Sequence, residues 1–513
     1  MPEEATATDV EKVPHDLDLD AALDDVLKEA RRDEVPDVLH HQDYREQWPS
    51  DRKALVAALA GGTYRPQPAR LVEVPKSTLA TRPIAVLSLA DRVLYEAVMQ
   101  RVGPALDKIL SEEVFSARLK QNKAGRWRPE KQVKSWVKFQ DAGRDLCDDY
   151  EQACLLTTDI TSYFEFVELG TLLKSINAVP GVDEGLVKVL SQFLNGVTSV
   201  ATDLHGLPQG PEVSSILGNF YLLPLDAVLR KLDVRWIRFQ DDIKVFATDP
   251  HILRLAVREL MPAVRGRHLN LSTAKTKILE GEAVREHFED SKKDAIQYGL
   301  DIESPDVLDD LRTLFDEAVS GGDVNERDVR FAINRFRKLG DDYAVGWVLA
   351  NLDTVPYLAS YLVTYLTQHF ESRPEVETSV RSFLGDPARN ISPVVEMHLI
   401  RLLARAPRVS DDTYKALWST LKDQTKEGFV REWAARAVGR HLRDDAARMP
   451  DVELLRSLFK LSTENHGLRR ALLVGIYEAE SVDKAWLSDV ASADESLRYT
   501  CAYLRAKPEL PPP

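Results

Sequence analysis

The pattern of the sequence changes near residue 300, and this change limits the folds that the chain can adopt. From Leu71 to about Ile278, short runs rich in β-branched and aromatic residues alternate with stretches of helical periodicity. Beyond residue 300 almost no strand pattern remains, and amphipathic helical segments follow one another. We therefore expect the 513 residues to form a mixed α+β part followed by an all-α part.

Composition indicates a globular protein and excludes several classes. The chain is 44% apolar and 29% charged, which is enough apolar material for hydrophobic cores. Its three cysteines form no CxxC pair and its 11 histidines form no HxxxH cluster, so we expect neither a disulfide framework nor a thiolate zinc site. No apolar run approaches the roughly 18 residues of a membrane span, and the acidic start is unlike a secretion signal. We expect a cytoplasmic protein without a membrane partner.

Charge is distributed unevenly. Of the net charge of −15, residues 1–35 supply −8, from 12 acidic and 4 basic side chains. Residues 115–140 instead hold 8 basic side chains and 1 acidic one, with two phenylalanines and two tryptophans among them. Such interleaving suits a phosphate backbone with stacked bases. A solvated basic loop with packed tryptophans fits the same pattern equally well, so the segment alone leaves both interpretations open.

A repeat of amphipathic helices is expected in residues 301–513. Arg431, Arg469 and Arg498 lie near the starts of similar helices, at separations of 38 and 29 residues. This irregular period is consistent with stacked helix pairs of the HEAT kind. A plain helical bundle is the alternative.

Two segments of the mixed part bring carboxylates to strand ends. The run CLLTT leads directly into Asp159, and an aspartate at a strand end is accessible but fixed by the sheet. The runs RWIRF and IKVFA flank Gln240-Asp241-Asp242, which we interpret as a hairpin turn with adjacent carboxylates. Alternation places Asp241 and Asp242 on opposite sides, so that one can meet Asp159.

These aspartates form a candidate site for divalent cations. Oxygen ligands without histidine or cysteine suit Mg²⁺ or Mn²⁺. Two such ions about 3.5–4 Å apart activate a hydroxyl and stabilise a leaving pyrophosphate. We therefore predict metal ligation by Asp159, Asp241 and Asp242, with a solvated turn as the alternative for the aspartate pair taken alone.

Three further segments carry residues suited to phosphate groups. Gly206–Gly210 make a tight approach of backbone to a ligand, which tolerates little side-chain bulk. Lys76 and Arg82, together with Arg92, lie in or beside strand-like runs and are candidates to grip a triphosphate. Lys275 is a candidate to protonate or neutralise pyrophosphate. Each of these cations, taken alone, also fits an ordinary surface charge.

In this order and at these spacings, the segments resemble reverse transcriptases over roughly residues 65–280. The match consists of a fingers segment PK…TRPIAVLSLADR, Asp159 with Phe164 five residues later, Leu207–Gly210 with Ser214 and Asn219, the [YF]xDD box at Phe239–Asp242, and Leu269, Leu271, Lys275 and Thr276. Phe239 replaces the usual tyrosine of the box, and Ser215 stands where many relatives have proline. Neither departure removes a carboxylate.

The resemblance implies a right-hand polymerase, with fingers over residues 61–150 and a palm over residues 151–300, that adds deoxynucleotides to a nucleic acid. By the same resemblance, the metal ions belong to Asp159 and Asp241 with Asp242 beside them, and Lys275 is the acid near pyrophosphate. The nucleotide pocket is assigned to Lys76, Arg82, Phe164 as steric gate, Gln209 and Gly210.

We expect an acidic helical region over residues 1–60, to which no role is assigned. The helical repeat region over residues 301–513, which follows a compact reverse-transcriptase core, resembles the bacterial abortive-infection and defence-associated reverse transcriptases. This resemblance implies anti-phage defence, homo-oligomers, and in some members protein-primed or untemplated synthesis. Tyr44, in the polar context HHQDYREQWPS, is the candidate primer, with an ordinary surface tyrosine as the alternative.

Three other functions compete with this hypothesis. Template-directed synthesis on a dedicated non-coding RNA would use residues 115–140 to hold the RNA. A catalytically inactive polymerase fold would serve as a scaffold that binds nucleic acid through its helical part. An RNA-making polymerase is a further alternative, against which the bulky Phe164 argues.

Overall fold

The computed structural model describes residues 16–149, 154–198, 205–304, 306–321, 323–443, 445, 447–480, 483–506 and 509–513. The chain forms two compact units. The first unit comprises Met1–Glu29, Ser50–Val72 and Pro83–Ser291, and the second unit comprises Ala30–Pro49, Glu73–Arg82 and Lys292–Pro513. Two short segments near the N-terminus therefore belong with the C-terminal helices.

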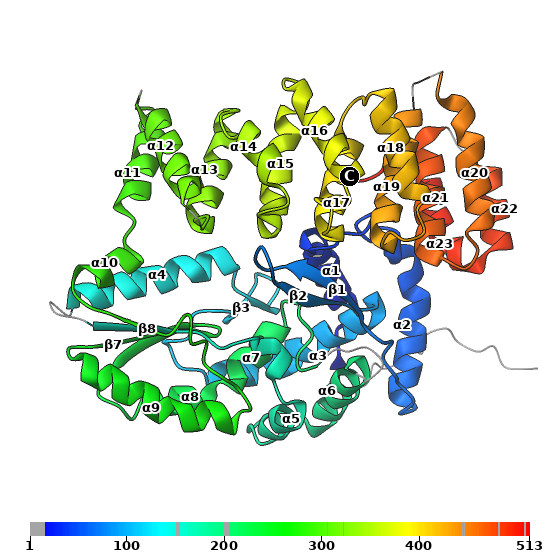
Figure 1. The fold of residues 1–513 in the computed structure, drawn as a ribbon. Helices are drawn as coiled ribbons and strands as arrows, with labels where there is room; N and C mark the ends of the chain where they lie inside the picture. The colour runs from blue at the N-terminus through cyan, green and yellow to red at the C-terminus, as the bar shows by residue number, and fades with distance from the viewer. Residues whose placement is uncertain are drawn as a thin grey trace, which may run out of the picture. The chain divides into compact units, whose positions relative to one another are not determined.

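A four-stranded antiparallel sheet in the order β6–β7–β5–β8 is the framework of the first unit (Figure 1). The strands are β5 (Cys154–Thr158), β6 (Arg235–Phe239), β7 (Asp242–Ala247) and β8 (Lys277–Leu279). These bounds confirm the strand patterns predicted around Asp159 and on both sides of Gln240. In Figure 1, α4 (Gln132–Asp149) lies above the sheet and α9 (Pro250–Gly266) below it.

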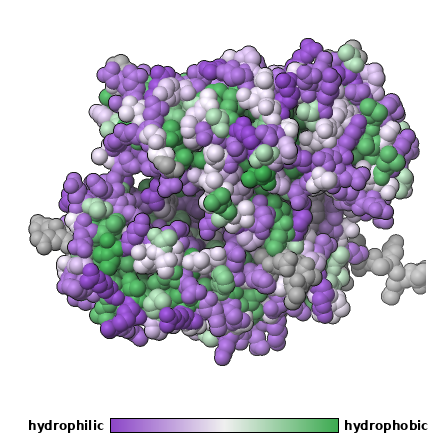
Figure 2. All heavy atoms as spheres, viewed as in Figure 1, coloured by the Kyte–Doolittle hydropathy of each residue, from purple (hydrophilic) through white to green (hydrophobic). Residues whose placement is uncertain are grey.

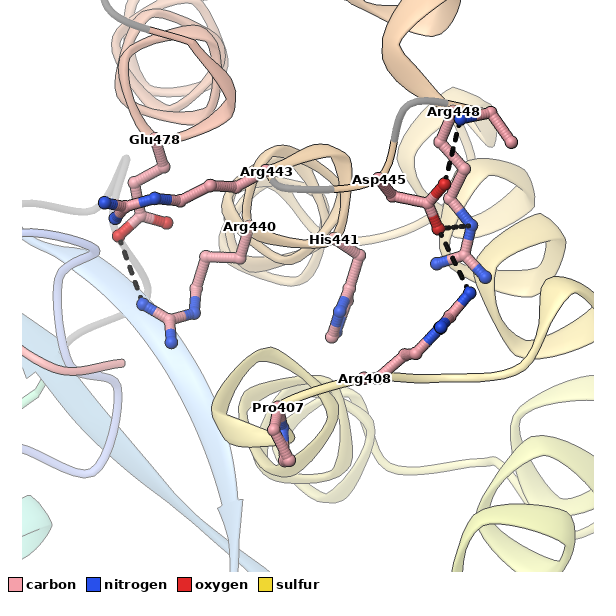
Figure 3. Close-up of a pocket in the computed structure, with 9 residues that line it drawn as sticks. Pro407, Arg408, Arg440, His441, Arg443, Asp445, Arg448 and Glu478 are labelled. Carbon is pink, nitrogen blue, oxygen red and sulfur yellow. Dashed lines mark hydrogen bonds and ion pairs between the residues drawn. The ribbon is translucent and has the colours of Figure 1, made fainter.

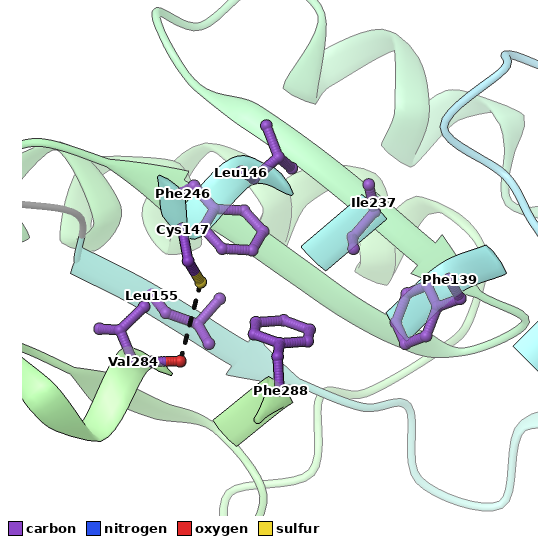
Figure 4. Packing of buried hydrophobic residues seen from close by; sticks show 8 residues of the cluster. All are labelled: Phe139, Leu146, Cys147, Leu155, Ile237, Phe246, Val284 and Phe288. Atoms are coloured by element: carbon purple, nitrogen blue, oxygen red, sulfur yellow. Dashed lines mark hydrogen bonds between the residues drawn. The ribbon is translucent and has the colours of Figure 1, made fainter. Parts of the chain in front are cut away.

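The upper face of the sheet is covered by a hydrophobic cluster (Figure 4). It joins α4, three strands and α10 (Glu282–Phe288) through Phe139, Leu146, Cys147, Leu155, Ile237, Phe246, Val284 and Phe288. Gly143 of α4 allows this packing, because a Cβ there would lie 2.2 Å from the Phe288 ring. Burial of each large apolar side chain contributes about 1.5–3 kcal/mol. The cluster therefore holds the sheet rigid beneath its loops.

The rest of the first unit packs around α3 (Leu89–Lys108), which begins where Ser88 Oγ accepts a hydrogen bond from the Asp91 N–H at 3.2 Å. Such a cap satisfies one of the free N–H groups of the first turn. The other elements are α1 (Leu19–Glu29), β1 (Arg70–Pro75), β2 (Thr81–Val86), β3 (Leu119–Gln121), β4 (Trp127–Pro129), η3 (Tyr163–Phe166), α5 (Leu169–Asn177), α6 (Glu184–Val197), α7 (Ser214–Tyr221) and α8 (Leu223–Leu229).

The described part of the second unit C-terminal to Lys292 is built of helices alone. They are α11 (Ser291–Asp301), α12 (Val307–Ser320), α13 (Glu326–Leu339), α14 (Val345–Asn351), η5 (Pro356–Leu358), α15 (Ala359–His369), α16 (Pro374–Gly385), α17 (Pro393–Arg405), α18 (Asp411–Lys422), α19 (Gly428–Leu442), η6 (Met449–Asp451), α20 (Val452–Leu461), α21 (His466–Ala479), α22 (Lys484–Ala493), η7 (Glu495–Leu497) and α23 (Arg498–Ala506). The prediction of mainly helical structure after residue 300 is confirmed, while the HEAT-like repeat stays a prediction.

Helices α17, α19 and α21 pack against one another in sequence order. The backbones of α19 and α21 meet at two glycines, because a Cβ on Gly439 would lie 2.1 Å from the Gly475 carbonyl oxygen. Small residues are therefore required at this crossing.

The segment Ala30–Pro49, with η2 (Ala30–Arg32) and the start of α2 (Tyr44–Ala60), is bound to the C-terminal helices. The Trp433 indole donates to the Pro36 carbonyl at 2.9 Å. The Arg470 guanidinium forms ion pairs with Asp37 and Asp43, each at 2.6 Å. These groups are buried, so the segment is an integral part of the second unit.

The face in Figure 2 is covered mainly by hydrophilic residues, and hydrophobic side chains appear on it in smaller patches. Among the helices that the structure describes, none combines the length and the apolarity that crossing a membrane requires. Cys147, Cys154 and Cys501 are all buried and free, which agrees with the expected absence of a disulfide framework.

Candidate active site

The end of β5 lies opposite the turn between β6 and β7. Thr158 pairs with Ile243 across the two strands, and Phe239 pairs with Asp242 across the hairpin. Asp159 follows β5 directly, and Gln240 and Asp241 form the two-residue turn. The predicted hairpin is confirmed. Its turn is therefore placed beside Asp159 by strand register alone.

Hydrogen bonds from several elements fix the turn. Gln240 has a φ of 59°, in the left-handed region that such a residue seldom adopts. Its N–H donates to Ser116 Oγ at 2.8 Å, and its side-chain amide donates to the Ser215 carbonyl at 3.1 Å. Arg238 donates to the Gln240 carbonyl at 3.2 Å. The residue before Asp241 is thus held from several directions.

Arg238 is the centre of this network and is fully buried. Its guanidinium donates to the Asp226 carboxylate at 2.7 and 2.8 Å, and to the side-chain and main-chain oxygens of Asn219 at 2.8 and 3.0 Å. Asp226 and Asn219 are fully buried as well. The buried ion pair between Arg238 and Asp226 was not expected from the sequence. The signals that were present are an arginine between the apolar residues Ile237 and Phe239 of the strand RWIRF and a single aspartate inside the apolar helix LPLDAVL.

Asp241 lies in an unfavourable electrostatic environment. Burial and the charge of Asp159, with a smaller effect of Asp242, raise the pKa of Asp241 to about 7. Lys275 opposes this shift only partly. A bound cation would relieve this cost of ionising Asp241.

Lys275 is held against Asp159 by the segment that follows α9. Its ammonium donates to Asp159 Oδ2 at 2.8 Å, while the side chain is 60% exposed. Burial alone would lower the pKa of Lys275, but its hydrogen bond to Asp159 and the charges of the three aspartates raise it. The backbone around it is fixed, because the Ser272 N–H donates to the Asp159 carbonyl at 2.7 Å and the Thr157 hydroxyl to the Lys275 carbonyl at 3.1 Å.

Asp242 occupies a different position from Asp241. It is the first residue of β7 and forms an ion pair with Lys244 at 2.7 Å. Within the part of the chain that the structure describes, no group of three or more acidic, histidine or cysteine side chains is arranged to hold a metal ion. The geometry thus brings Asp159, Asp241 and Lys275 together, with Asp242 in the role of a neighbour.

Phe164 and the Gly206–Gly210 loop are joined by their backbones. The Leu207 N–H donates to the Phe164 carbonyl at 2.8 Å. Gly206 has a φ of 69°, and a Cβ there would lie 2.0 Å from the same carbonyl oxygen. At the other end of the loop, the Gln209 carbonyl accepts a hydrogen bond from the Ala85 N–H at 2.8 Å. Gln209 and Gly210 are thereby fixed beside β2, and the half-buried Phe164 ring packs at 5.5 Å from the Tyr163 ring.

The three predicted triphosphate-binding cations are divided between the two units. Lys76 is exposed and, like Arg82, belongs to the second unit, where Arg82 forms an ion pair with Glu34 at 2.9 Å. Arg92 is buried in the first unit against Glu29 at 3.1 Å. Their role in binding a nucleotide stays a prediction.

Tyr44 does not have the exposed position expected for it. The residue is 7% exposed in the second unit, and its ring packs 6.2 Å from that of Trp48. The polar residues that flank Tyr44 in the sequence suggested exposure, but its side chain packs against Trp48, one helical turn away. Its role as a primer stays a prediction.

The aromatic residues of the segment 115–140 are largely packed. Phe139 is in the hydrophobic cluster of Figure 4, Phe115 and Trp136 pack against that cluster, and Trp127 is 36% exposed. Several basic side chains of the segment are in ion pairs: Lys120 and Lys138 with Glu130, Arg118 with Asp107, and Arg128 with Asp25 and Glu96. This arrangement favours packed aromatics with paired charges over a surface for stacked bases.

Comparison with known proteins places this site in a family. Residues 74–301 match the family model "Reverse transcriptase (RNA-dependent DNA polymerase)". Protein YkfC of Escherichia coli (strain K12) is 25% identical over 179 residues, which is 34% of this chain and 44% of that protein. The group II intron-encoded protein LtrA of Lactococcus lactis subsp. cremoris is 24% identical over 192 residues, 36% of this chain and 29% of that protein. The chain thus spans less than half the length of these relatives.

Among solved structures, one chain of a partial Cas6-RT-Cas1–Cas2 complex matches with a TM-score of 0.26 and 18% identity, over 49% of this chain and 43% of that one. Telomerase from Candida albicans, in complex with a fragment of telomeric RNA, matches with a TM-score of 0.33 and 10% identity, over 72% of this chain and 70% of that one.

Proposed function

Because residues 74–301 constitute a reverse transcriptase domain, we propose that the chain is an RNA-directed DNA polymerase that adds deoxynucleotides by two-metal catalysis. The observation that carries this proposal is the convergence of Asp159, Asp241 and Lys275 at one end of the sheet. The substrates are deoxynucleoside triphosphates and a nucleic-acid strand.

The donor set fits a divalent cation. Carboxylate oxygens are the ligands that Mg²⁺ prefers. The pKa of Asp241 is raised by its burial and then by the negative charge of Asp159, which Lys275 only partly offsets. We assign Asp159 and Asp241 as the ligands, with Asp242 beside them. Bound Mg²⁺ or Mn²⁺ supplies activation of the attacking hydroxyl and stabilisation of the leaving pyrophosphate.

Other residues of the chain take the remaining roles. Lys275 keeps its proton because its pKa is raised, and its exposed ammonium can deliver that proton to pyrophosphate. We assign Phe164 as the group that excludes a ribose 2′-hydroxyl. Its backbone carbonyl is held by the Gly206–Gly210 loop, whose Gln209 and Gly210 we assign to the nucleotide pocket.

The first test is incorporation of labelled deoxynucleotides by the purified chain with Mg²⁺ or Mn²⁺, on RNA and DNA primer-templates and without either. We expect Asp241→Asn to reduce incorporation by about a hundredfold or more, because removal of one charged ligand weakens cation binding. Asp233→Asn is the matched control, since it makes the same change at the exposed residue that precedes β6. Absence of incorporation under every condition would falsify the proposal.

Two measurements separate the proposal from its alternatives. A product of fixed complementary sequence supports a dedicated RNA template, whereas homopolymeric or random DNA supports untemplated synthesis. Competition between ribonucleotides and deoxynucleotides tests the steric gate, and Phe164→Ala is expected to raise ribonucleotide use. A parent chain that already prefers ribonucleotides would indicate an RNA-making polymerase.

The cellular role that we propose is anti-phage defence, with assembly as a homo-oligomer. A helical C-terminal region after a compact polymerase part supports this role through the resemblance described above. Plaque formation on bacteria that express the parent chain or Asp241→Asn tests it. Equal plaque numbers with both chains, for every phage tried, would exclude the role.

A further inference from the structure

Two neighbouring helices of the second unit carry arginines at the same spacing. Arg401, Arg405 and Arg408 are followed, 35 residues later in each case, by Arg436, Arg440 and Arg443. The first two residues of each set lie on α17 and α19 respectively, which pack side by side. The spacing of four residues places the two helical members of each set on one face of their helix, about 6 Å apart along its axis. Arg408 and Arg443 follow the ends of the two helices. We call these six residues the arginine ladder.

The upper end of the ladder lines a cavity of about 620 Å³ (Figure 3). Arg408, Arg440 and Arg443 surround it, together with Arg448 and His441. In Figure 3 the side chains of Arg408 and Arg440 extend into the space between the helices. Four arginines and two carboxylates, Asp445 and Glu478, thus line the cavity.

The described carboxylates of this region are shared between arginines. Glu478 pairs with both Arg436, at 2.9 Å, and Arg440, at 3.6 Å. Asp445 pairs with both Arg408, at 3.6 Å, and Arg448, at 3.4 Å. Arg448 also contacts Asp411 at 2.7 Å. Among the residues that the structure describes here, Arg408, Arg436, Arg440 and Arg448 thus share three carboxylates.

The lower end of the ladder shows the same imbalance. Arg401 lies over the Trp433 ring at 4.9 Å, and its buried Nε has no hydrogen-bond acceptor within the residues that the structure describes. Burial and the charges of Arg405 and Arg436 lower the pKa of Arg401 to about 10. A guanidinium among like charges gains more than usual from an anion.

Oxygen atoms of the chain itself already occupy part of the ladder. Arg405 Nε donates to the Pro513 main-chain oxygen at 2.5 Å, and Arg436 donates to the Pro511 carbonyl. His40 lies 3.2 Å from the Pro512 oxygen. These contacts show that donors from α17 and α19 converge on a row of oxygens, as they would on successive phosphates.

We propose that the arginine ladder, from Arg405 to the cavity lined by Arg408, Arg440 and Arg443, binds the phosphodiester backbone of a single-stranded nucleic acid. The choice of a nucleic acid as the occupant rests on the proposed polymerase function. The cavity residues favour a strand over a free nucleotide, because no phenylalanine, tyrosine or tryptophan among the described lining residues offers a slot for a base. Contacts to phosphate alone make binding independent of sequence.

The test is fluorescence anisotropy of a labelled 20-nucleotide oligo-dT with the full chain, in EDTA and over a range of salt concentrations. We expect Arg408→Gln/Arg440→Gln to bind at least fivefold more weakly at 0.1 M salt. Loss of two phosphate contacts lowers the slope of log K against log salt by about 1.4, at about 0.7 per contact for a single strand. Arg408→Lys/Arg440→Lys keeps the charges and should keep the slope. Lys484→Gln/Arg498→Gln removes two exposed charges elsewhere in the unit and should bind like the parent.

Three results would overturn the assignment. The first is that the glutamine variant binds oligo-dT like the parent. The second is that dTTP competes as well as unlabelled oligo-dT at equal phosphate concentration. The third is that a poly-glutamate of equal length binds as tightly as oligo-dT. Differences between matched variants cancel any binding at the polymerase site. Incorporation by the parent is measured separately, so that a failure of the polymerase proposal and a failure of the ladder give different patterns.

Discussion

Replacement of Arg238 by methionine tests how the candidate site is held. The change keeps most of the side-chain volume but removes five hydrogen bonds, two to Asp226, two to Asn219 and one to the Gln240 carbonyl. It leaves Asp226 fully buried without its cation. Breaking a buried ion pair on one side costs about 3–5 kcal/mol. That is a large share of the roughly 5–15 kcal/mol that stabilises an ordinary domain.

The two effects of this change can be separated. Urea unfolding of the parent and Arg238→Met gives the loss of stability of the first unit. In Arg238→Met/Asp226→Leu no unpaired charge remains, so we expect most of the stability to return. The Gln240 carbonyl still lacks its donor, and we expect kcat for incorporation to stay low while KM for deoxynucleotides changes little.

The reasoning on Arg238 is refuted by either of two results. One is a change of less than about 1 kcal/mol in the unfolding free energy of Arg238→Met, given the cost expected for a buried charge. The other is a double variant that incorporates deoxynucleotides at the rate of the parent. The second result would mean that strand register alone aligns Asp241.

Three further predictions concern the second unit. Arg470→Met should lower the unfolding free energy of this unit by about 3–5 kcal/mol, because Asp37 and Asp43 lose their shared cation. Urea unfolding measures the change, and a loss below about 1 kcal/mol would contradict the role of these ion pairs in stability. Gly439→Ala should lower the unfolding free energy by about 1–3 kcal/mol, because its Cβ overpacks against α21. Gly346→Ala on α14 is the control: its Cβ meets nothing within 4 Å, so it should raise the unfolding free energy by up to about 1 kcal/mol. Equal effects of the two changes would refute the close crossing of α19 and α21. Burial and two neighbouring arginines lower the pKa of His398 to about 3. The unfolded chain therefore binds a proton that the folded chain does not, and stability falls as pH drops below about 6.5, by about 2 kcal/mol at pH 5. His398→Leu should flatten this pH dependence of the unfolding free energy in urea titrations, and an unchanged dependence would exclude His398 as its source.

The strands and the site turn were predictable because they depend on local pattern. Alternating runs end at Asp159 and on both sides of Gln240, and the structure has strands at these places. The approach of Asp241 to Asp159 then follows from a single register, Thr158 with Ile243. Because strand pairing fixes which residues lie opposite one another, the local strand patterns were enough to predict that Asp159 and Asp241 lie close together, although some eighty residues separate them in the chain.

The partners of buried charges were not predictable in the same way. Residues 1–60 were expected to form an acidic helical region, but nothing there indicated that Asp37 and Asp43 pair with Arg470, more than four hundred residues later. The surroundings of Tyr44 likewise looked polar along the chain, while the ring is buried. Such contacts join separate elements, and no periodicity within either element specifies them.

Arg401 and Arg470 show why a count of charges is a poor guide to their effect. Burial lowers the pKa of Arg470, but the charges of Asp37 and Asp43 raise it well above its ordinary value. The pKa of Arg401 is lowered, because burial is joined by two like charges. The same change should therefore have opposite consequences at the two positions. Arg401→Met relieves repulsion and keeps an apolar stem on Trp433, so we expect its unfolding free energy in urea to match or exceed that of the parent. A loss of stability as large as that of Arg470→Met would show that Arg401 is balanced by a partner, and the ladder would then lack the free charge on which its affinity for phosphate depends.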